Sequence, residues 1–248
     1  MIEFQDVTLA YNSNRVLDRV SFTAQFWDRL AFLGGSGEGK TTILKLLLAL
    51  VRPDSGRIMI DGEDITRLSE SQLRPIRRKF TIVFQEGALF DSLSVRENVA
   101  YCMREQGALS EEDIDEEVRN LLRKVGIEGA IDLMPEELSG GMQRRAAIAR
   151  SMAAGEPRMM LYDEPTTGLD PLTAENIGDL ISELSAGEPP DRRGSIIVTH
   201  DVTAAARVSE RFLYLKNGRI TFDGDLPGLL NTDDEELKKF IDALFLLR

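Results

Sequence analysis

Residues 34–41 read Gly-Gly-Ser-Gly-Glu-Gly-Lys-Thr, which is the pattern G-x-x-x-x-G-K-[ST] of a loop that binds phosphate groups. The apolar run before it, residues 29–33, is typical of a short strand, and residues 41–51 after it are apolar nearly all round, as in a buried helix. A strand, a glycine loop and a helix in this order direct backbone N–H groups and the positive end of the helix at a polyphosphate. A chance glycine-rich turn before a lysine would leave both flanks unexplained.

The residues of this loop have separate expected tasks. Glycine at positions 34, 37 and 39 lets the backbone take up tight conformations and approach phosphates without a clash from a Cβ atom. The Lys40 ammonium is expected to reach the β- and γ-phosphates, and the Thr41 hydroxyl is expected to ligate Mg²⁺.

Composition narrows the class of protein. A chain of 248 residues fits one α/β domain with an inserted subdomain better than two independent domains. Its net charge of −12 argues against a duplex DNA binder, which needs a basic surface. The single cysteine, Cys102, excludes an intrachain disulfide and suits a reducing compartment.

The sequence shows no targeting or membrane-spanning pattern. Residues 1–6 lack a basic region followed by an apolar one, so no signal peptide is expected. The longest apolar stretch, residues 43–51, is far shorter than the roughly 20 residues that a membrane-spanning helix needs. We therefore expect a soluble chain that works at a membrane only by docking to another protein.

The order of elements predicts the architecture. Alternating residues over 2–11 and 20–26, with a turn at 12–14, predict an antiparallel β unit. Buried-type runs predict strands at 57–61, 80–84, 158–162 and 195–199. A helix is expected over 171–185, a short one over 204–209, and a hairpin at Asn217-Gly218. Residues 94–154 carry only helical patterns, with capping residues at Ser94 and Ser110. Alternating strands and helices imply a mostly parallel sheet that is covered on both faces.

Two adjacent carboxylates, Asp163 and Glu164, follow an apolar strand pattern. The carboxyl end of such a strand is where open α/β sheets bind ligands. Asp163 is expected to hold Mg²⁺ through water, and Glu164 to orient or deprotonate an attacking water molecule. The simpler alternative is a solvated acidic pair at the end of a strand.

A second expected anion site begins at Ser139. Residues 144–150 are strong helix formers, and Ser139 can cap the helix that contains them. The two glycines after Ser139 open its first turn and leave N–H groups free. Such a pattern alone is more often a plain helix cap. Here Leu138-Ser139-Gly140-Gly141 matches the signature of ATP-binding cassette (ABC) ATPases. The other motifs of that family stand around it in the family's order: the loop at Gly34, Gln85 after a strand, Asp163-Glu164, Gly168-Leu169-Asp170 and Thr199-His200-Asp201.

From about residue 11 to residue 201 the chain therefore resembles an ABC nucleotide-binding domain. The resemblance implies an α/β fold, namely a P-loop NTPase (a RecA-like core with an N-terminal antiparallel β unit) plus an inserted all-α subdomain. We expect one ABC ATPase domain over 1–248. It would comprise a core of 1–85 and 156–225, a helical subdomain of 86–155 and a C-terminal helical tail of 226–248.

The resemblance also implies the site residues. His200, the only histidine, would hydrogen-bond the γ-phosphate and position Glu164, and Gln85 would sense Mg²⁺. Tyr11 would lie on adenine, with burial in the core as the alternative. The expected catalytic residues are Lys40, Gln85, Glu164 and His200, and the expected Mg²⁺ ligands are Thr41, Gln85 and Asp163. The expected ATP-binding residues are Tyr11, Gly34, Gly35, Ser36, Gly37, Glu38, Gly39, Lys40, Thr41, Thr42, Ser139, Gly140, Gly141 and Asp170.

The mechanism that the resemblance implies is a head-to-tail dimer of two copies of the chain. Each of two ATP molecules would lie between one copy's P-loop and the other copy's Ser139-Gly140-Gly141. Two helix N-termini and a lysine would then surround the triphosphate, and hydrolysis would let the halves part.

Residues 84–99 resemble more narrowly the ATPases of Mla-type (organic-solvent-resistance) lipid transporters, and Met142 agrees with that group. The implied partners are a membrane permease, whose cytoplasmic helix would dock near residues 85–98, an MCE-type lipid-binding protein and a STAS-domain protein. The implied location is the cytoplasmic face of the inner (plasma) membrane. Ala88, Leu89 and Phe90 would form the apolar part of the docking groove, with core burial as an equal alternative.

The last residues carry an apolar stripe at helical spacing: Leu237, Phe240, Ile241, Leu244 and Phe245, followed by Leu246 and Leu247. Such a stripe usually packs on its own domain, and the hypothesis here is that part of it contacts a second subunit or partner.

Three functions compete. A transport ATPase ranks first, and transport of another substrate remains open within it. A soluble ABC ATPase of the repair or translation kind would show a long coiled-coil insertion, a tandem cassette or basic stretches, all absent from this sequence. A P-loop kinase would not need Glu164, His200 and the Ser139 signature together. No nucleic-acid partner is expected.

Overall fold

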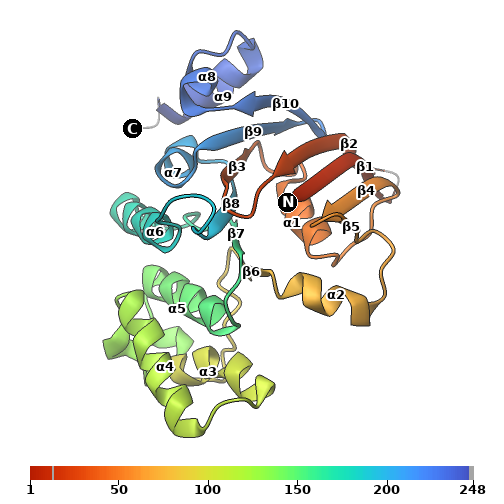
Figure 1. The fold of residues 1–248 in the computed structure, drawn as a ribbon. Helices are drawn as coiled ribbons and strands as arrows, with labels where there is room; N and C mark the ends of the chain where they lie inside the picture. Colours follow the sequence, from red (N-terminus) through yellow and green to blue (C-terminus); the bar gives the residue numbers. More distant parts are fainter. Residues whose placement is uncertain (13, 246–248) are drawn as a thin grey trace.

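The computed structural model describes residues 1–12 and 14–245, with only the backbone of residues 243–245, and it contains two sheets (Figure 1). The larger sheet has six strands in the order β10-β9-β3-β8-β7-β6. These strands are β3 (Arg29–Leu33), β6 (Phe80–Val83), β7 (Met159–Asp163), β8 (Gly194–Thr199), β9 (Arg211–Lys216) and β10 (Arg219–Gly224). Neighbours are parallel throughout except β10, which pairs antiparallel with β9, so the predicted mostly parallel sheet is confirmed.

Three central strands of this sheet, β3, β7 and β8, are buried along almost their whole length. Burial on both faces explains why they read as continuous apolar runs rather than as alternating patterns. The register places Leu33 opposite Thr199 and Asp163 opposite Val198, so the carboxyl ends of the three strands meet at one edge. The segments that follow these strands therefore lie together.

The smaller sheet is the antiparallel unit predicted near the N-terminus, and its order is β2-β1-β4-β5. Its strands are β1 (Ile2–Tyr11), β2 (Asn14–Ala24), β4 (Ser55–Ile60) and β5 (Glu63–Asp64). Phe22 stacks on Phe4 within this sheet and meets Phe32 of β3 edge-on, with ring centroids 5.1 Å apart. Aromatic packing thus fixes the small sheet to the large one.

Helices surround the sheets, and three of them, α3 to α5, form a separate group at the bottom of Figure 1. Within the stretch from Ser94 to Ala154, all of it described, no strand occurs, as predicted. The helices are α1 (Lys40–Leu47), α2 (Glu70–Arg77), α3 (Val95–Gln106), α4 (Glu111–Lys124), α5 (Gly140–Ala153), α6 (Pro171–Leu184), α7 (Val202–Val208), α8 (Leu226–Leu230) and α9 (Glu235–Phe245), with 3₁₀ turns η1 (Glu128–Ala130) and η2 (Pro135–Glu137). The Ser94 and Ser110 side chains cap α3 and α4 in capping boxes.

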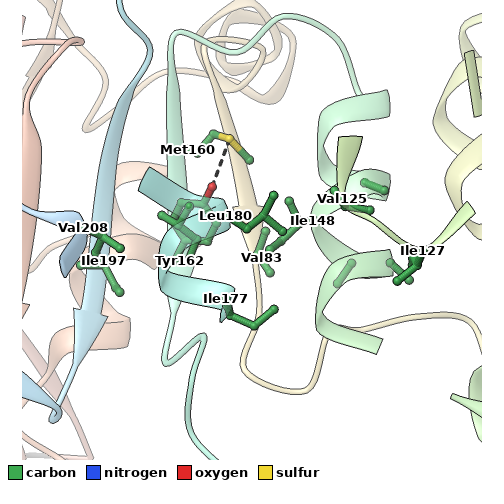
Figure 2. Close-up of a cluster of buried hydrophobic side chains, with 14 of the residues drawn as sticks. Val83, Val125, Ile127, Ile148, Met160, Tyr162, Ile177, Leu180, Ile197 and Val208 are labelled. Atoms are coloured by element: carbon green, nitrogen blue, oxygen red, sulfur yellow. Dashed lines mark hydrogen bonds between the residues drawn. The ribbon is translucent and has the colours of Figure 1, made fainter. Parts of the chain in front are cut away.

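Strand β7 separates two hydrophobic cores. Met159 and Leu161 face a core shared with α1 and the small sheet, whereas Met160 and Tyr162 face the other, shared with α3 to α7. Figure 2 shows Tyr162 among Ile177, Leu180 and Ile148, with its hydroxyl donating to the sulfur of Met160 at 3.2 Å. The helical group therefore packs on the same strand that carries Asp163.

The helix after the P-loop is shorter than predicted. It ends at Leu47 rather than at residue 51, and Leu50 is 53% exposed instead of buried. The Leu50 N–H donates to the Lys45 carbonyl and the Ala49 N–H to the Leu46 carbonyl, while Ala49 has φ 49°. These two bonds form a Schellman cap, which here has alanine at the left-handed position where glycine is usual.

Helix α2 has no counterpart among the predicted elements, because it is short and Pro75 lies within it. At the other end of the chain, Leu237 and Ile241 of α9 are buried, and the Phe240 ring packs on Tyr214 with centroids 5.1 Å apart. This part of the apolar stripe packs on its own domain. The side chains of Leu244, Phe245, Leu246 and Leu247 lie outside the described residues.

Candidate functional site

The P-loop connects β3 to α1 and lies against strands β2 and β9. A Cβ atom on Gly34 would be 2.5 Å from the Leu215 carbonyl oxygen, so only glycine fits there. Gly39 has φ 98° and its Cβ would be 3.0 Å from the Val16 carbonyl oxygen. The close approach explains why glycine is needed at these two positions.

Glu38 has an anchoring role that its sequence position does not reveal. Its carboxylate accepts a 2.6 Å hydrogen bond from the Asn217 N–H and lies 3.3 Å from the Lys216 ammonium. The same ammonium lies 3.1 Å from Glu236 of α9. The P-loop is thereby tied to the β9–β10 turn and, through Lys216, to the C-terminal helix.

Lys40 is almost completely buried and lies at the centre of the site. Its ammonium donates to the carbonyls of Gly34 (3.0 Å) and Gly35 (2.9 Å) and lies 3.3 Å from Glu164 Oε1. A buried ammonium held by the loop's own backbone is placed where the loop would enclose phosphate groups.

Thr41 and Asp163 come together although they are far apart in the sequence. The Thr41 hydroxyl donates to Asp163 Oδ1 at 2.9 Å. Burial raises the pKa of Asp163, the hydrogen bond from Thr41 opposes this rise, and the adjacent Glu164 charge adds to it. One hydroxyl and one carboxylate in contact are hard oxygen ligands of the kind Mg²⁺ uses together with water and substrate phosphates, so these residues fit that ion.

Glu164 accepts hydrogen bonds from two other segments. Thr167 Oγ1 donates to Glu164 Oε2 at 3.0 Å, and the His200 Nδ1 atom lies 3.0 Å from the same oxygen. The Glu164 side chain is 11% exposed, whereas the His200 ring is half exposed. The carboxylate is therefore fixed between Lys40, Thr167 and His200 at the carboxyl edge of the sheet.

Two other predicted site residues lie at the surface. The Tyr11 side chain, at the end of β1, is exposed, so the alternative of a core aromatic is wrong. Gln85 is exposed and follows β6, which is the neighbour of β7, so it stands near the edge that carries Asp163. No hydrogen bond joins the Gln85 side chain to Thr41 or Asp163, all three of which are described residues.

The signature residues form the N-terminus of α5. The Ser139 hydroxyl accepts the Met142 N–H at 3.3 Å, so it caps the helix as predicted. Ser139 and Gly140 are exposed, and a Cβ on Gly141 would lie 2.5 Å from Thr173 of α6. Asp170 caps α6 through the Thr173 N–H, and hydrogen bonding to Thr173 lowers the pKa of Asp170. The described residues show no hydrogen bond between this signature and the P-loop of the same chain.

A groove with a volume of about 300 Å³ separates the P-loop core from the helical group. Its lining includes Leu48, Phe84, Ala88, Cys102, Ala147 and Arg150. At its rim the Arg150 guanidinium lies 4.6 Å from the centre of the exposed Phe90 ring. The groove is mixed in character, because its lining combines apolar side chains with two arginines, Arg77 and Arg150.

The sequence-based reasoning missed Arg144 and Thr167. Arg144 is buried on α5 and donates to the carbonyls of Phe84 and Gln85, and more weakly to that of Thr167 at 3.5 Å. A signal existed, because Arg144 shares a helical face with Ile148 and Ser151, where a charged residue is unusual.

Two kinds of feature do not occur among the described residues, a ready-made metal cluster and a membrane-spanning helix. No group of three or more His, Cys, Asp and Glu side chains converges as a ready-made metal cluster in this part of the chain. None of the described helices has the length and apolar character that crossing a bilayer requires.

A family model described as ABC transporter matches residues 17–167. The intermembrane phospholipid transport system ATP-binding protein MlaF of Escherichia coli (strain K12) is 36% identical over 244 residues, which is 98% of this chain and 89% of that protein. The probable ribonucleotide transport ATP-binding protein mkl of Mycobacterium tuberculosis (strain H37Rv) is 34% identical over 242 residues, which is 98% of this chain and 66% of that protein.

Among solved structures, the chain resembles the dimeric ATP-binding cassette MJ0796 in a post-hydrolysis state bound to ADP and phosphate. The TM-score is 0.81 at 32% identity, and the match covers 91% of this chain and 99% of that one. The predicted P-loop NTPase fold is thereby confirmed.

Proposed function

This chain belongs to the ABC transporter family, and from that premise we propose that it is the ATP-hydrolysing subunit of a phospholipid transporter. ATP hydrolysis to ADP and phosphate is the activity of this family's ATP-binding domain. The observation that carries the proposal is the fixed carboxylate of Glu164, which is held among Lys40, Thr167 and His200.

In the proposed reaction, the P-loop N–H groups and Lys40 hold the β- and γ-phosphates. Glu164 takes a proton from a water molecule as the oxygen of that water attacks the γ-phosphorus. The bond between the γ-phosphorus and the bridging oxygen of the β-phosphate breaks, which leaves ADP and phosphate. His200 keeps Glu164 in place and donates to the γ-phosphate. Thr41 and Asp163, with Gln85, would hold Mg²⁺. The ion would neutralise the negative charge that develops on the phosphates.

We propose that the site is completed by a second copy of the chain. Ser139 and Gly140 are exposed at the N-terminus of α5, whose positive end has no anionic partner in the same chain among the described hydrogen bonds and ion pairs. A head-to-tail dimer would place this N-terminus on the γ-phosphate bound to the partner's P-loop. The dimeric state of MJ0796 supports this arrangement.

The groove between the core and the helical group is the proposed docking site for a cytoplasmic helix of a membrane permease. The groove lies beside the segment that carries Gln85. A movement of the docked permease helix would therefore displace that segment and, with it, Gln85 at the catalytic site. An MCE-type lipid-binding protein and a STAS-domain protein are the proposed accessory partners, and the proposed location is the cytoplasmic face of the inner membrane.

The transported substrate needs its own test, because the names of the two relatives mention different substrates, phospholipid and ribonucleotide. The test is to reconstitute the chain with a candidate membrane permease in liposomes that contain a fluorescent phospholipid, and separately to offer a labelled ribonucleotide. We expect ATP-dependent phospholipid movement that stops with Glu164→Gln. ATP-dependent ribonucleotide uptake without phospholipid movement would contradict the proposed substrate but not the ATPase.

A further inference from the structure

Arg144 is an unusual residue for its surroundings. Its side chain is 6% exposed, and burial lowers the pKa of its guanidinium. Within the described part of the chain no carboxylate pairs with it, and its Nε atom has no hydrogen-bond partner. A buried cation without a counter-ion is destabilising, so its hydrogen bonds must offset part of this penalty.

The hydrogen bonds of Arg144 all cross from α5 to other segments. Nη1 donates to the carbonyls of Phe84, at 2.9 Å, and Gln85, while Nη2 reaches the Thr167 carbonyl at 3.5 Å. A guanidinium suits this task, because its five donors form a rigid planar fork that can serve two loops from one side chain. The fork therefore joins α5 to the loops that follow β6 and β7.

The second of these loops leads directly to the catalytic carboxylate. The Thr167 carbonyl accepts the hydrogen bond from Arg144. The Thr167 hydroxyl in turn donates to Glu164 Oε2 at 3.0 Å. Ser139, at the N-terminus of the same helix α5, lies five residues before Arg144. The signature, the Gln85 loop and Glu164 are thus connected through one buried side chain.

We propose that Arg144 is a positioning residue that sets Gln85 and, through Thr167, Glu164 relative to the signature helix. The proposal rests on the roles of Glu164 and Gln85 in the proposed function. Arg144 touches neither the P-loop nor Thr41, so its loss should misplace the catalytic groups without weakening nucleotide binding. Displacement of reacting groups by a fraction of an ångström to an ångström is enough to lower kcat strongly.

The test is Arg144→Met in the full-length chain, with kcat and KM for ATP, affinity for ADP and thermal stability all measured. We expect kcat to fall roughly ten- to hundredfold, with KM and ADP affinity unchanged. Arg144→Lys should recover part of kcat, since an ammonium can serve the adjacent Phe84 and Gln85 carbonyls but not the third. The matched control is Arg145→Met, which removes a bond to the Val125 carbonyl inside the helical group and should leave kcat near that of the unmodified chain.

A double-mutant cycle with Thr167→Val tests the connection to Glu164. If Arg144 acts through Thr167, Arg144→Met should lower kcat less in the Thr167→Val background than in the unmodified chain. Additive effects would overturn the proposed connection. An unchanged kcat in Arg144→Met, or a parallel loss of kcat, ADP affinity and stability, would overturn the positioning role. Substantial hydrolysis by Glu164→Gln in the same assay would instead contradict the proposed function itself.

Discussion

Glu164 has a backbone conformation that glutamate seldom adopts. Its φ is 47°, in the left-handed region, and its N–H donates to the Val198 carbonyl at 2.9 Å. Such a conformation costs about 1–3 kcal/mol and is found mainly where the surrounding structure enforces it at functional sites. The reversal at the end of β7 explains how two adjacent residues, Asp163 and Glu164, can both face the site.

Glu164→Gln is the first prediction at the residue scale. The substitution keeps the size and most hydrogen bonds of the side chain but removes the group that accepts the proton from water. We expect kcat for ATP hydrolysis to fall by about 10²–10⁴-fold, with ATP affinity retained. Steady-state hydrolysis and titration with a fluorescent nucleotide measure the two quantities separately. A variant that keeps substantial turnover would contradict the assignment.

The sequence predicted the residues of this site with very different success. Lys40 and Thr41 could be placed because the glycine-loop pattern assigns them. Asp163 and His200 could be placed because each stands at the carboxyl end of a recognisable strand, and parallel strands bring such positions to one edge. Arg144 could not, because its partners are backbone carbonyls of distant loops, which leave no trace in a pattern of residue types. Thr167 could not, because its hydroxyl reaches Glu164 through the turn after β7, which the sequence pattern does not reveal.

At the scale of secondary-structure elements, Asp61 connects four segments of the chain. It lies after β4 and forms ion pairs with the N-terminal ammonium of Met1 (2.7 Å), Lys79 (2.8 Å) and Arg158 (2.8 Å). Burial tends to raise the pKa of Asp61, but hydrogen bonds from Lys79 and the N-terminal ammonium outweigh it and lower the pKa to about 2. The cluster connects the small sheet to the starts of β6 and β7.

This lowered pKa predicts a dependence of stability on pH. Because the folded value lies below the ordinary one, the contribution of Asp61 is fully present above about pH 4 and is lost as the pH falls toward 2. We expect Asp61→Asn to reduce the free energy of unfolding by about 1 kcal/mol at pH 6, after allowance for solvent screening. Urea unfolding of both proteins at pH 6 and pH 3 should show the difference shrinking at the lower pH. A constant difference would contradict the ion-pair origin.

The packing of the C-terminal helix α9 gives a second prediction for elements. Leu237 is 1% exposed, so Leu237→Ala should leave a cavity and lower the free energy of unfolding by about 2–5 kcal/mol. Leu230→Ala is the control, because Leu230 is 47% exposed and its truncation should change stability by about 0.5 kcal/mol or less. Denaturant unfolding measures both. Equal small effects would indicate that α9 does not depend on its own domain for stability.

At the scale of the whole molecule, the large sheet separates two hydrophobic cores. The face of β7 that carries Met160 and Tyr162 packs on the helical group (Figure 2). The opposite face packs on the P-loop helix and the small sheet. The helical group therefore shares a hydrophobic core with the strand that ends in Asp163. This arrangement suits a protein in which docking on one side is coupled to hydrolysis at the sheet edge.

The proposed head-to-tail dimer makes a prediction about mixtures of variants. Ser139→Arg should abolish hydrolysis while leaving nucleotide binding by the single chain intact, since in this dimer Ser139 would act on the partner's nucleotide. A mixed dimer of Ser139→Arg with Glu164→Gln contains one site with both residues intact, so mixing the two inactive proteins should restore part of the activity. Hydrolysis assays across mixing ratios measure the restored ATPase activity. Failure of the mixture to regain activity, or loss of binding in Ser139→Arg alone, would contradict action in trans.

The sequence by itself determined the fold class, the phosphate-binding loop and the residues at the ends of the strands. These depend on local patterns, namely apolar runs, glycines and caps, that act over a few neighbouring positions. Only the tertiary structure decided where α1 ends, that Tyr11 is exposed, and that Arg144 joins α5 to Phe84, Gln85 and Thr167. The physical reason is that burial and hydrogen bonds to backbone carbonyls arise between segments distant in sequence, and any residue type supplies the same carbonyl.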